Sequence, residues 1–157
     1  MKQLTRTSIA FGFALVLPLA PLSAQPIVAV DAPAAQERRA NDPTTIDARW
    51  AEAERLFAEG RLRESLREFT DIAKIQEDYL INAAETFWRI AEIQNALGDQ
   101  LKMARAMDSA AREAEKVGNV DLQVRALREA ATGYRAIRQF GLANSRMERI
   151  QSLAAQN

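Results

Sequence analysis

Apolar side chains recur at steps of three and four residues from about residue 43 to the C-terminus, with polar and charged side chains between them. This spacing puts the apolar positions on one face of an α-helix, and no stretch alternates as a β-strand does. Gly60, Gly98 and Gly118 each follow one of these runs, where glycine commonly ends a helix. The pattern predicts an all-α domain at residues 42–157, with six helices at about 43–58, 61–76, 80–97, 99–117, 119–137 and 139–155.

Residues suited to cap helices precede several of these segments. Side-chain oxygens that accept from the first turn of a helix are expected from Asp42, Asp99 and Asn119. Pro43 fits the first helical position, where its missing N–H is not needed. Asn82 with Glu85 three residues later predicts a capping box at the start of the third helix.

The chain contains an internal repeat. Two sets of residues share the same spacing and repeat with a period of 38, namely Trp50, Glu54 and Gly60, and Trp88, Glu92 and Gly98. Periods of this size are typical of arrays of helical hairpins, in which each unit buries its apolar face against its neighbours. The third unit follows with a period of 40, which predicts a slightly longer connection between the second and third hairpins. We therefore expect three hairpins.

Residues 1–41 have a different character. Lys2 and Arg6 precede an apolar run at residues 9–17, and small residues end the segment at Ala24. This arrangement predicts a secretory signal peptide at residues 1–24, and hence export to the periplasm or the exterior of the cell. Leu22 is bulky for its place before the cleavage site, so an uncleaved anchor remains an alternative. Residues 25–41 are rich in Ala and Pro and are expected to form a flexible linker.

Composition restricts the possible chemistry. The chain has no Cys and no His, which excludes a disulfide framework and removes the commonest metal ligand and general base. Without the segment 1–24 it carries 19 basic and 21 acidic side chains, a net charge of −2, which does not favour nucleic-acid binding. No nucleophile–base pair, phosphate-binding loop or metal-ligand spacing occurs. We expect no cofactor, no metal and no enzymatic activity, and a carrier or enzyme is the least favoured alternative.

The helical region resembles the tetratricopeptide repeat (TPR) family, whose repeats combine large and small residues at set places in two helices. The middle repeat carries these at Phe87, Ile90, Ala91, Gly98, Met103, Met107 and Ala110. The first carries Arg49, Glu52, Ala53, Leu56, Gly60, Ser65, Phe69 and Ile72, with Arg49 and Glu52 where apolar residues are expected, and the third Leu127, Ala130, Ala131, Tyr134, Phe140, Ala143, Met147 and Ile150. The resemblance implies a right-handed α–α superhelix of three hairpins. Because the period exceeds the usual length of about 34 residues, a related α-solenoid remains an alternative.

The resemblance also implies a function, because TPR-like domains usually bind an extended peptide or a helix along the concave surface lined by the first helix of each hairpin. The positions of this sequence that correspond to the groove-facing residues of those first helices give ten partner-binding candidates: Trp50, Glu54, Phe57, Trp88, Glu92, Asn95, Arg125, Arg128, Thr132 and Arg135. Aromatic residues and Arg are also the residues most often found at binding hot spots. The competing interpretation is that both tryptophans are half-buried packing residues and that the arginines form a solvated face.

These observations predict an exported, non-catalytic scaffold that binds a protein or peptide partner. Residues 41–98 carry a net charge of −5 and residues 119–157 carry +3, so opposite charges would face the two ends of a bound partner. The alternative is a structural homo-oligomer that assembles through the last helix, because no further helix follows it in the sequence. Under this alternative, the partner is a second copy of the chain in a homodimer. Stable membrane insertion after signal cleavage is not expected.

Overall fold

The computed structural model describes residues 42–156, and the predicted signal peptide and linker lie outside them. The described residues form a short 3-10 helix and six α-helices, with no strand, so the prediction of an all-α domain is confirmed. The elements are η1 (Pro43–Thr45), α2 (Ile46–Ala58), α3 (Leu62–Asp78), α4 (Ala84–Ala96), α5 (Gln100–Lys116), α6 (Val120–Ala136) and α7 (Phe140–Ala154). Between residues 42 and 156, no helix combines the length and apolar character needed to cross a membrane.

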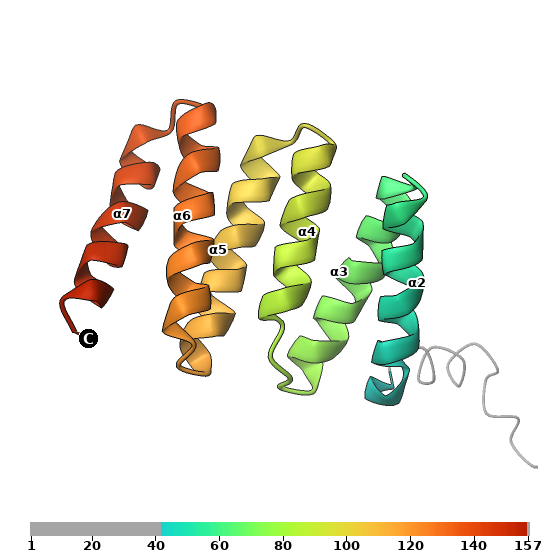
Figure 1. Cartoon of the computed structure of the whole chain (residues 1–157). Helices are drawn as coiled ribbons and strands as arrows, with labels where there is room; N and C mark the ends of the chain where they lie inside the picture. Colours follow the sequence, from blue (N-terminus) through green and yellow to red (C-terminus); the bar gives the residue numbers. More distant parts are fainter. Residues whose placement is uncertain (1–41, 157) are drawn as a thin grey trace, which may run out of the picture.

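The six α-helices follow one another in space in the order in which they occur in the chain. Figure 1 shows them running alternately up and down, from α2 at one end of the row to α7 at the other. Each helix packs mainly on the next one, and the contacts of α5 with α6 and with α4 are the most extensive. Because neighbours alternate in direction, α2, α4 and α6 begin at the same edge of the row, and α3, α5 and α7 end there.

All five connections between the α-helices contain the same backbone turn. One residue adopts a left-handed conformation, with φ between 56° and 79°, in each connection: Gly60, Leu80, Gly98, Gly118 and Arg138. The N–H of the following residue donates to the carbonyl five positions before it, at 2.7–2.9 Å. This is the Schellman arrangement, which satisfies carbonyls left free at the end of a helix. Glycine adopts it without steric cost, so the sequence indicated three of the five turns but not those at Leu80 and Arg138.

The predicted helix caps are largely confirmed. Asp42 Oδ1 accepts from Thr44 N at 2.9 Å, and Asp99 and Asn119 cap α5 and α6. The capping box is wrong, because the position before α4 is Ala83 and Asn82 lies one residue too early. Asn82 Oδ1 instead accepts from Ala84 N, while its Nδ2 donates to the Glu113 carbonyl of α5.

The predicted cause of the longer second period is also wrong. The connection between the second and third hairpins consists of 117–119, whereas that between the first and second consists of 79–83 and is the longer of the two. The longer period arises within the helices: α6 has 17 residues and the corresponding α4 has 13, and the connection before α6 is two residues shorter, which leaves a net difference of two. The extra residues of α6 add about one helical turn and leave the buried face of the helix nearly unchanged. This is why the periodic pattern hid it.

The turn at Arg138 leads to a testable expectation for stability. Its side chain is exposed and forms no ion pair within residues 42–156, while its φ of 61° is strained for a residue with a Cβ. We expect Arg138→Gly to raise the free energy of unfolding by about 0.5–1 kcal/mol, because relief of strain exceeds the added entropy of the unfolded chain. The same replacement at Arg135, in the last turn of α6, should lower it by about 0.5–1 kcal/mol. Urea unfolding monitored by circular dichroism measures both, and a loss of stability in Arg138→Gly would contradict this explanation.

The buried side chains form two clusters that meet at α4. The smaller one contains Ala53, Phe69, Ile72 and Ile93, and the larger one extends over α4 to α7. Ile90 packs against both clusters, so α4 joins them. The small residues expected at equivalent places in the repeats, Ala53, Ala91 and Ala131, are each no more than 1% exposed.

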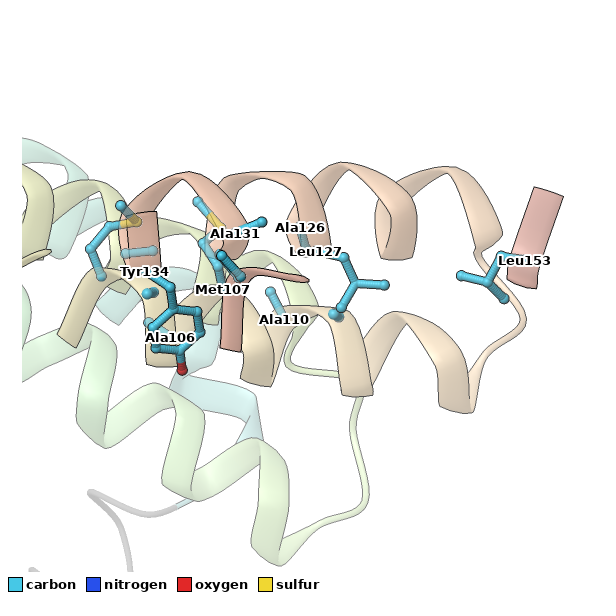
Figure 2. Close-up of a cluster of buried hydrophobic side chains, with 14 residues drawn as sticks. Ala106, Met107, Ala110, Ala126, Leu127, Ala131, Tyr134 and Leu153 are labelled. Carbon is cyan, nitrogen blue, oxygen red and sulfur yellow. The ribbon is translucent and has the colours of Figure 1, made fainter. Parts of the chain in front are cut away.

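The larger cluster consists mainly of alanines, which let α5 and α6 approach closely. Figure 2 shows Met107, Ala110, Ala126 and Leu127 within it, together with Tyr134. Gly133 marks the closest approach, because a Cβ added there would lie 2.7 Å from Met103 Cε and 3.0 Å from Ala104 Cβ. The glycine inside α6 therefore has a packing reason that outweighs its low helix propensity, a cost of about 1 kcal/mol.

A polar cluster, which we call the Asp108 clamp, ties three helices together. It consists of Asp108 on α5, Tyr134 on α6 and Arg146 on α7. Arg146 donates to both oxygens of Asp108, at 2.9 and 2.6 Å, and the Tyr134 hydroxyl donates to Oδ2 at 2.8 Å. The guanidinium also lies over the Tyr134 ring, 5.2 Å from its centroid. Burial, aided by the hydrogen bond to Asp108, raises the pKa of Tyr134, so the hydroxyl keeps its proton and remains a donor.

Candidate functional site

Alternate helices, α2, α4 and α6, contribute side chains to one groove. It has a volume of about 380 Å³ and we call it the tryptophan groove. Its lining residues are Trp50 from α2, Glu85, Trp88, Arg89 and Glu92 from α4, and Leu122 and Arg125 from α6. These three helices are the first helices of the three expected hairpins. The groove thus joins side chains that are distant in the sequence, from Trp50 to Arg125.

Both tryptophans have one side in the core and one side in the groove. The Trp50 ring meets the Phe69 ring edge to face, with 5.0 Å between centroids and 83° between planes. Trp88 packs against the larger cluster and is also partly exposed. Half-buried aromatic rings of this kind are held rigidly and lose little entropy when a partner covers them. The packing interpretation and the binding interpretation therefore apply to the same two residues.

Charged side chains at the floor of the groove are joined in a network centred on Glu92. Trp88 Nε1 donates to Glu92 Oε1 at 3.0 Å, and Arg89 Nη1 donates to Oε2 at 2.7 Å. Arg89 Nε also lies 2.8 Å from Glu54 Oε1, but that buried oxygen accepts no well-aligned hydrogen bond. The hydrogen bond to Glu92 raises the pKa of Arg89 against the opposing effect of burial. Arg89 therefore stays charged and holds Glu54 of α2 close to α4.

Two charges at the groove are not neutralised by an ion pair. Arg125 lies with its guanidinium 5.0 Å from the centroid of the Trp88 ring, and Glu85 is exposed at the start of α4. Within residues 42–156, neither side chain forms an ion pair. A cation stacked on tryptophan keeps its N–H donors available for a carboxylate. The groove thus combines apolar side chains with one cation and one anion that form no ion pair among the described residues.

The ten sequence-derived candidates divide into those that share the groove and those that do not. Trp50, Trp88, Glu92 and Arg125 line it, and Glu54 reaches it through Arg89. Phe57 is partly buried and packs against the smaller core cluster, and Asn95 accepts from Gln100 Nε2 beside the turn between α4 and α5. The three remaining candidates lie farther along α6, on exposed positions outside the groove: Arg128, Thr132 and Arg135.

Three groove residues were not among the candidates. Glu85 and Leu122 lie three residues before Trp88 and Arg125. They therefore share the helix face of the candidates, one turn closer to the N-terminus of each helix. Arg89 follows Trp88 directly and has Glu92 three residues later, a spacing that allows an ion pair on a helix. Continuing the row of candidates on each helix face in both directions would have identified Glu85 and Leu122. The sequence contains no comparable signal for the contact of Arg89 with Glu54 on a different helix.

Comparison of the chain with protein-family models, with curated proteins and with solved structures gives no match. The functional interpretation therefore starts from the groove and from the sequence. The strongest geometric observation is that residues of three alternate helices converge on two tryptophans. The strongest chemical observation is that Glu85 and Arg125 remain without an ion-pair partner among the described residues.

Proposed function

We propose that this protein is an exported, non-catalytic scaffold that binds a protein or peptide partner in the tryptophan groove. The observation that carries the proposal is the convergence of Trp50, Trp88 and Arg125 from three different helices on one groove. Exposed aromatic residues and arginine supply most of the energy of many protein interfaces. A partner with an apolar side chain between a base and an acid would satisfy the tryptophans, Glu85 and Arg125 together.

The proposed architecture is a TPR-like, right-handed superhelix of three hairpins. Its support is the packing of each helix on the next, together with the repeated turn geometry and the repeated buried alanines. In such an arrangement the first helices of successive hairpins share one surface, which agrees with the three helices that line the groove. Export is supported by the sequence of residues 1–24 alone.

The exposed side of α7 favours the scaffold over the homo-oligomer that assembles through this helix. Phe140 and Leu142 are exposed at its start, but most of its other exposed positions are polar: Asn144, Ser145, Glu148, Arg149, Gln151 and Ser152. A polar outer face is what the last repeat of a helical array needs in order to remain soluble. The last helix thus has the surface of a cap more than that of an oligomer interface.

Exchanging the two unpaired charges tests the proposal without disturbing the core. We expect the double variant Glu85→Arg, Arg125→Glu to recover at least about 10-fold less of its partner from a periplasmic or secreted extract, a change of about 1.4 kcal/mol in binding. Both side chains are exposed and the net charge is unchanged, so folding should be preserved. Quantitative mass spectrometry of the captured proteins provides the measurement.

The matched control exchanges two charges away from the groove. Arg63 on α3 and Glu148 on α7 are exposed and form no ion pair among the described residues. The variant Arg63→Glu, Glu148→Arg should capture the same proteins as the wild type, in similar amounts. Equal recovery by all three proteins would reject the tryptophan groove as the binding site.

A further inference from the structure

A second groove lies between α5 and the connection of α3 with α4, away from the tryptophan groove and formed by other residues. It has a volume of about 610 Å³, and we call it the α5 groove. Apolar side chains of Leu80, Ile81, Phe87 and Val117 line it, with Gln76, Glu77 and Lys116 among its polar residues. Since the scaffold function does not use it, its exposed apolar surface needs an explanation of its own.

The apolar residues at this groove are unusually exposed. Leu80 is 94% exposed, Val117 60% and Ile81 39%. They account for three of the seven exposed large apolar residues among residues 42–156. Leu80 in addition holds a left-handed conformation, with φ at 56°, that disfavours a side chain. A contiguous apolar patch of this kind usually marks a docking surface.

The end of α3 beside the groove carries two acidic side chains, and the basic side chains that line the groove, Arg112 and Lys116, come from α5. Glu77 and Asp78 occupy the last turn of α3, which contains no basic residue. The C-terminus of a helix already has a partial negative charge, so acidic side chains there are unfavourable and a cation nearby is favourable. Both carboxylates are exposed and form no ion pair within the described part of the chain. A covering segment should therefore combine an apolar stretch with positive charge.

Residues 25–41 of this chain contain both an apolar stretch and positive charges, together with two acidic residues, Asp31 and Glu37, so that their net charge is zero. Residues 26–30, Pro-Ile-Val-Ala-Val, form an uncharged apolar stretch, and Arg38 and Arg39 follow it shortly before Asp42. The segment is also present whether or not cleavage occurs after Ala24. The apolar stretch thus suits the α5 groove. Arg38 and Arg39 suit the acidic end of α3, which lies between that groove and α2.

The chain also reaches far enough. The described part begins next to α2, at the same edge of the row of helices as the α3–α4 connection and the α5–α6 connection (Figure 1). From α2 to α5 there are three helix steps of about 8–10 Å, or about 24–30 Å in total. The intervening segment, 31–41, can span about 36–40 Å when extended. The segment is therefore long enough to connect α2 with the α5 groove.

We propose that residues 26–30 of the same chain occupy the α5 groove, with Arg38 and Arg39 beside Glu77 and Asp78. The segment covers Leu80 and Val117 and places its cations at the negative end of α3. A second copy of the protein is the competing occupant, and the experiment below separates the two.

Disulfide trapping in the full chain tests the proposal directly, because the sequence contains no cysteine. The variant Val28→Cys, Val117→Cys should form a disulfide within one chain under mild oxidation, since the two Cα atoms must come within about 7 Å. The matched control is Val28→Cys, Leu97→Cys, in which the second position is also exposed and lies on the connection of α4 with α5, at the opposite edge of the row but no more helix steps from α2 than Val117. We expect the groove pair to form the intrachain disulfide at least about 10-fold faster.

The remaining outcomes decide against the proposal. Equal rates for the two pairs overturn it, and disulfides that join two chains assign the groove to a second copy. A second measurement does not depend on cysteines in the helices. In the full-length variant Ile27→Asp, Val28→Asp, the methyl NMR signals of Leu80, Ile81 and Val117 should shift, while that of Leu153 should not. Unchanged signals at the groove would also overturn the proposal.

Discussion

Replacing Phe69 with Ala is expected to lower the free energy of unfolding by about 3–5 kcal/mol. Phe69 is 1% exposed, lies in the smaller core cluster and supports the Trp50 ring from below the groove. Its loss would leave a cavity between α2 and α3 and would free Trp50 from its edge-to-face contact. Chemical denaturation measures the stability, and the near-ultraviolet circular dichroism of the folded variant reports the loosened tryptophan.

The control for this variant is Phe140→Ala. Phe140 is 59% exposed at the start of α7, so the same truncation there removes little buried surface. We expect a change of less than about 1 kcal/mol. If the two variants lose similar stability, the packing of α2 and α3 around Phe69 is not as described.

The second large effect is expected at the Asp108 clamp. In Asp108→Ala, the Arg146 guanidinium and the Tyr134 hydroxyl lose their shared acceptor, although both remain largely buried. Removing one member of a buried, hydrogen-bonded ion pair is strongly destabilising. We expect the free energy of unfolding to fall by about 2–4 kcal/mol. Urea unfolding at neutral pH provides the measurement.

A matched exposed ion pair serves as the control. Arg149 and Glu115 also join α7 to α5, at 2.6 Å, but their side chains are 43% and 52% exposed. Solvent screens such pairs, so Glu115→Ala should lose no more than about 1 kcal/mol. A loss of that size in Asp108→Ala as well would show that burial adds nothing to the clamp.

The helices were predictable because their signals are local. Apolar spacing identified all six, and Gly60, Gly98 and Gly118 identified three turns at their ends. Leu80 and Arg138 adopt the same turn without glycine, so their sequence carries no sign of it. The start of α4 was predicted too early, at about residue 80, for the same reason. The apolar spacing continues through Leu80, although the chain makes a turn at this residue.

The candidate site was predictable where the repeat fixes the phase of a helix. Trp50, Trp88, Glu92 and Arg125 lie in the groove because equivalent positions of α2, α4 and α6 share a face. The sequence does not specify how far one helix slides along the next, and this offset decided which turn of α6 meets Trp88. Leu122 and Arg125 therefore line the groove, whereas Arg128 lies beyond it.

Contacts between distant charged residues were not predictable from the sequence. Asp108 of α5 meets Arg146 of α7, and Arg89 of α4 meets Glu54 of α2. Each of these side chains has other charged residues nearby in the sequence that are equally plausible partners. Only the packing of the helices selects one of them.

The most direct test of partner binding in the tryptophan groove is a titration of the captured partner into purified protein, followed by tryptophan fluorescence. The chain contains two tryptophans, and both line the groove, so the signal has one source. We predict that binding changes the emission and that Glu85→Arg, Arg125→Glu raises the Kd at least about 10-fold, while Arg63→Glu, Glu148→Arg does not. An unchanged Kd in the groove variant, with no change of emission on binding, would contradict the proposed function.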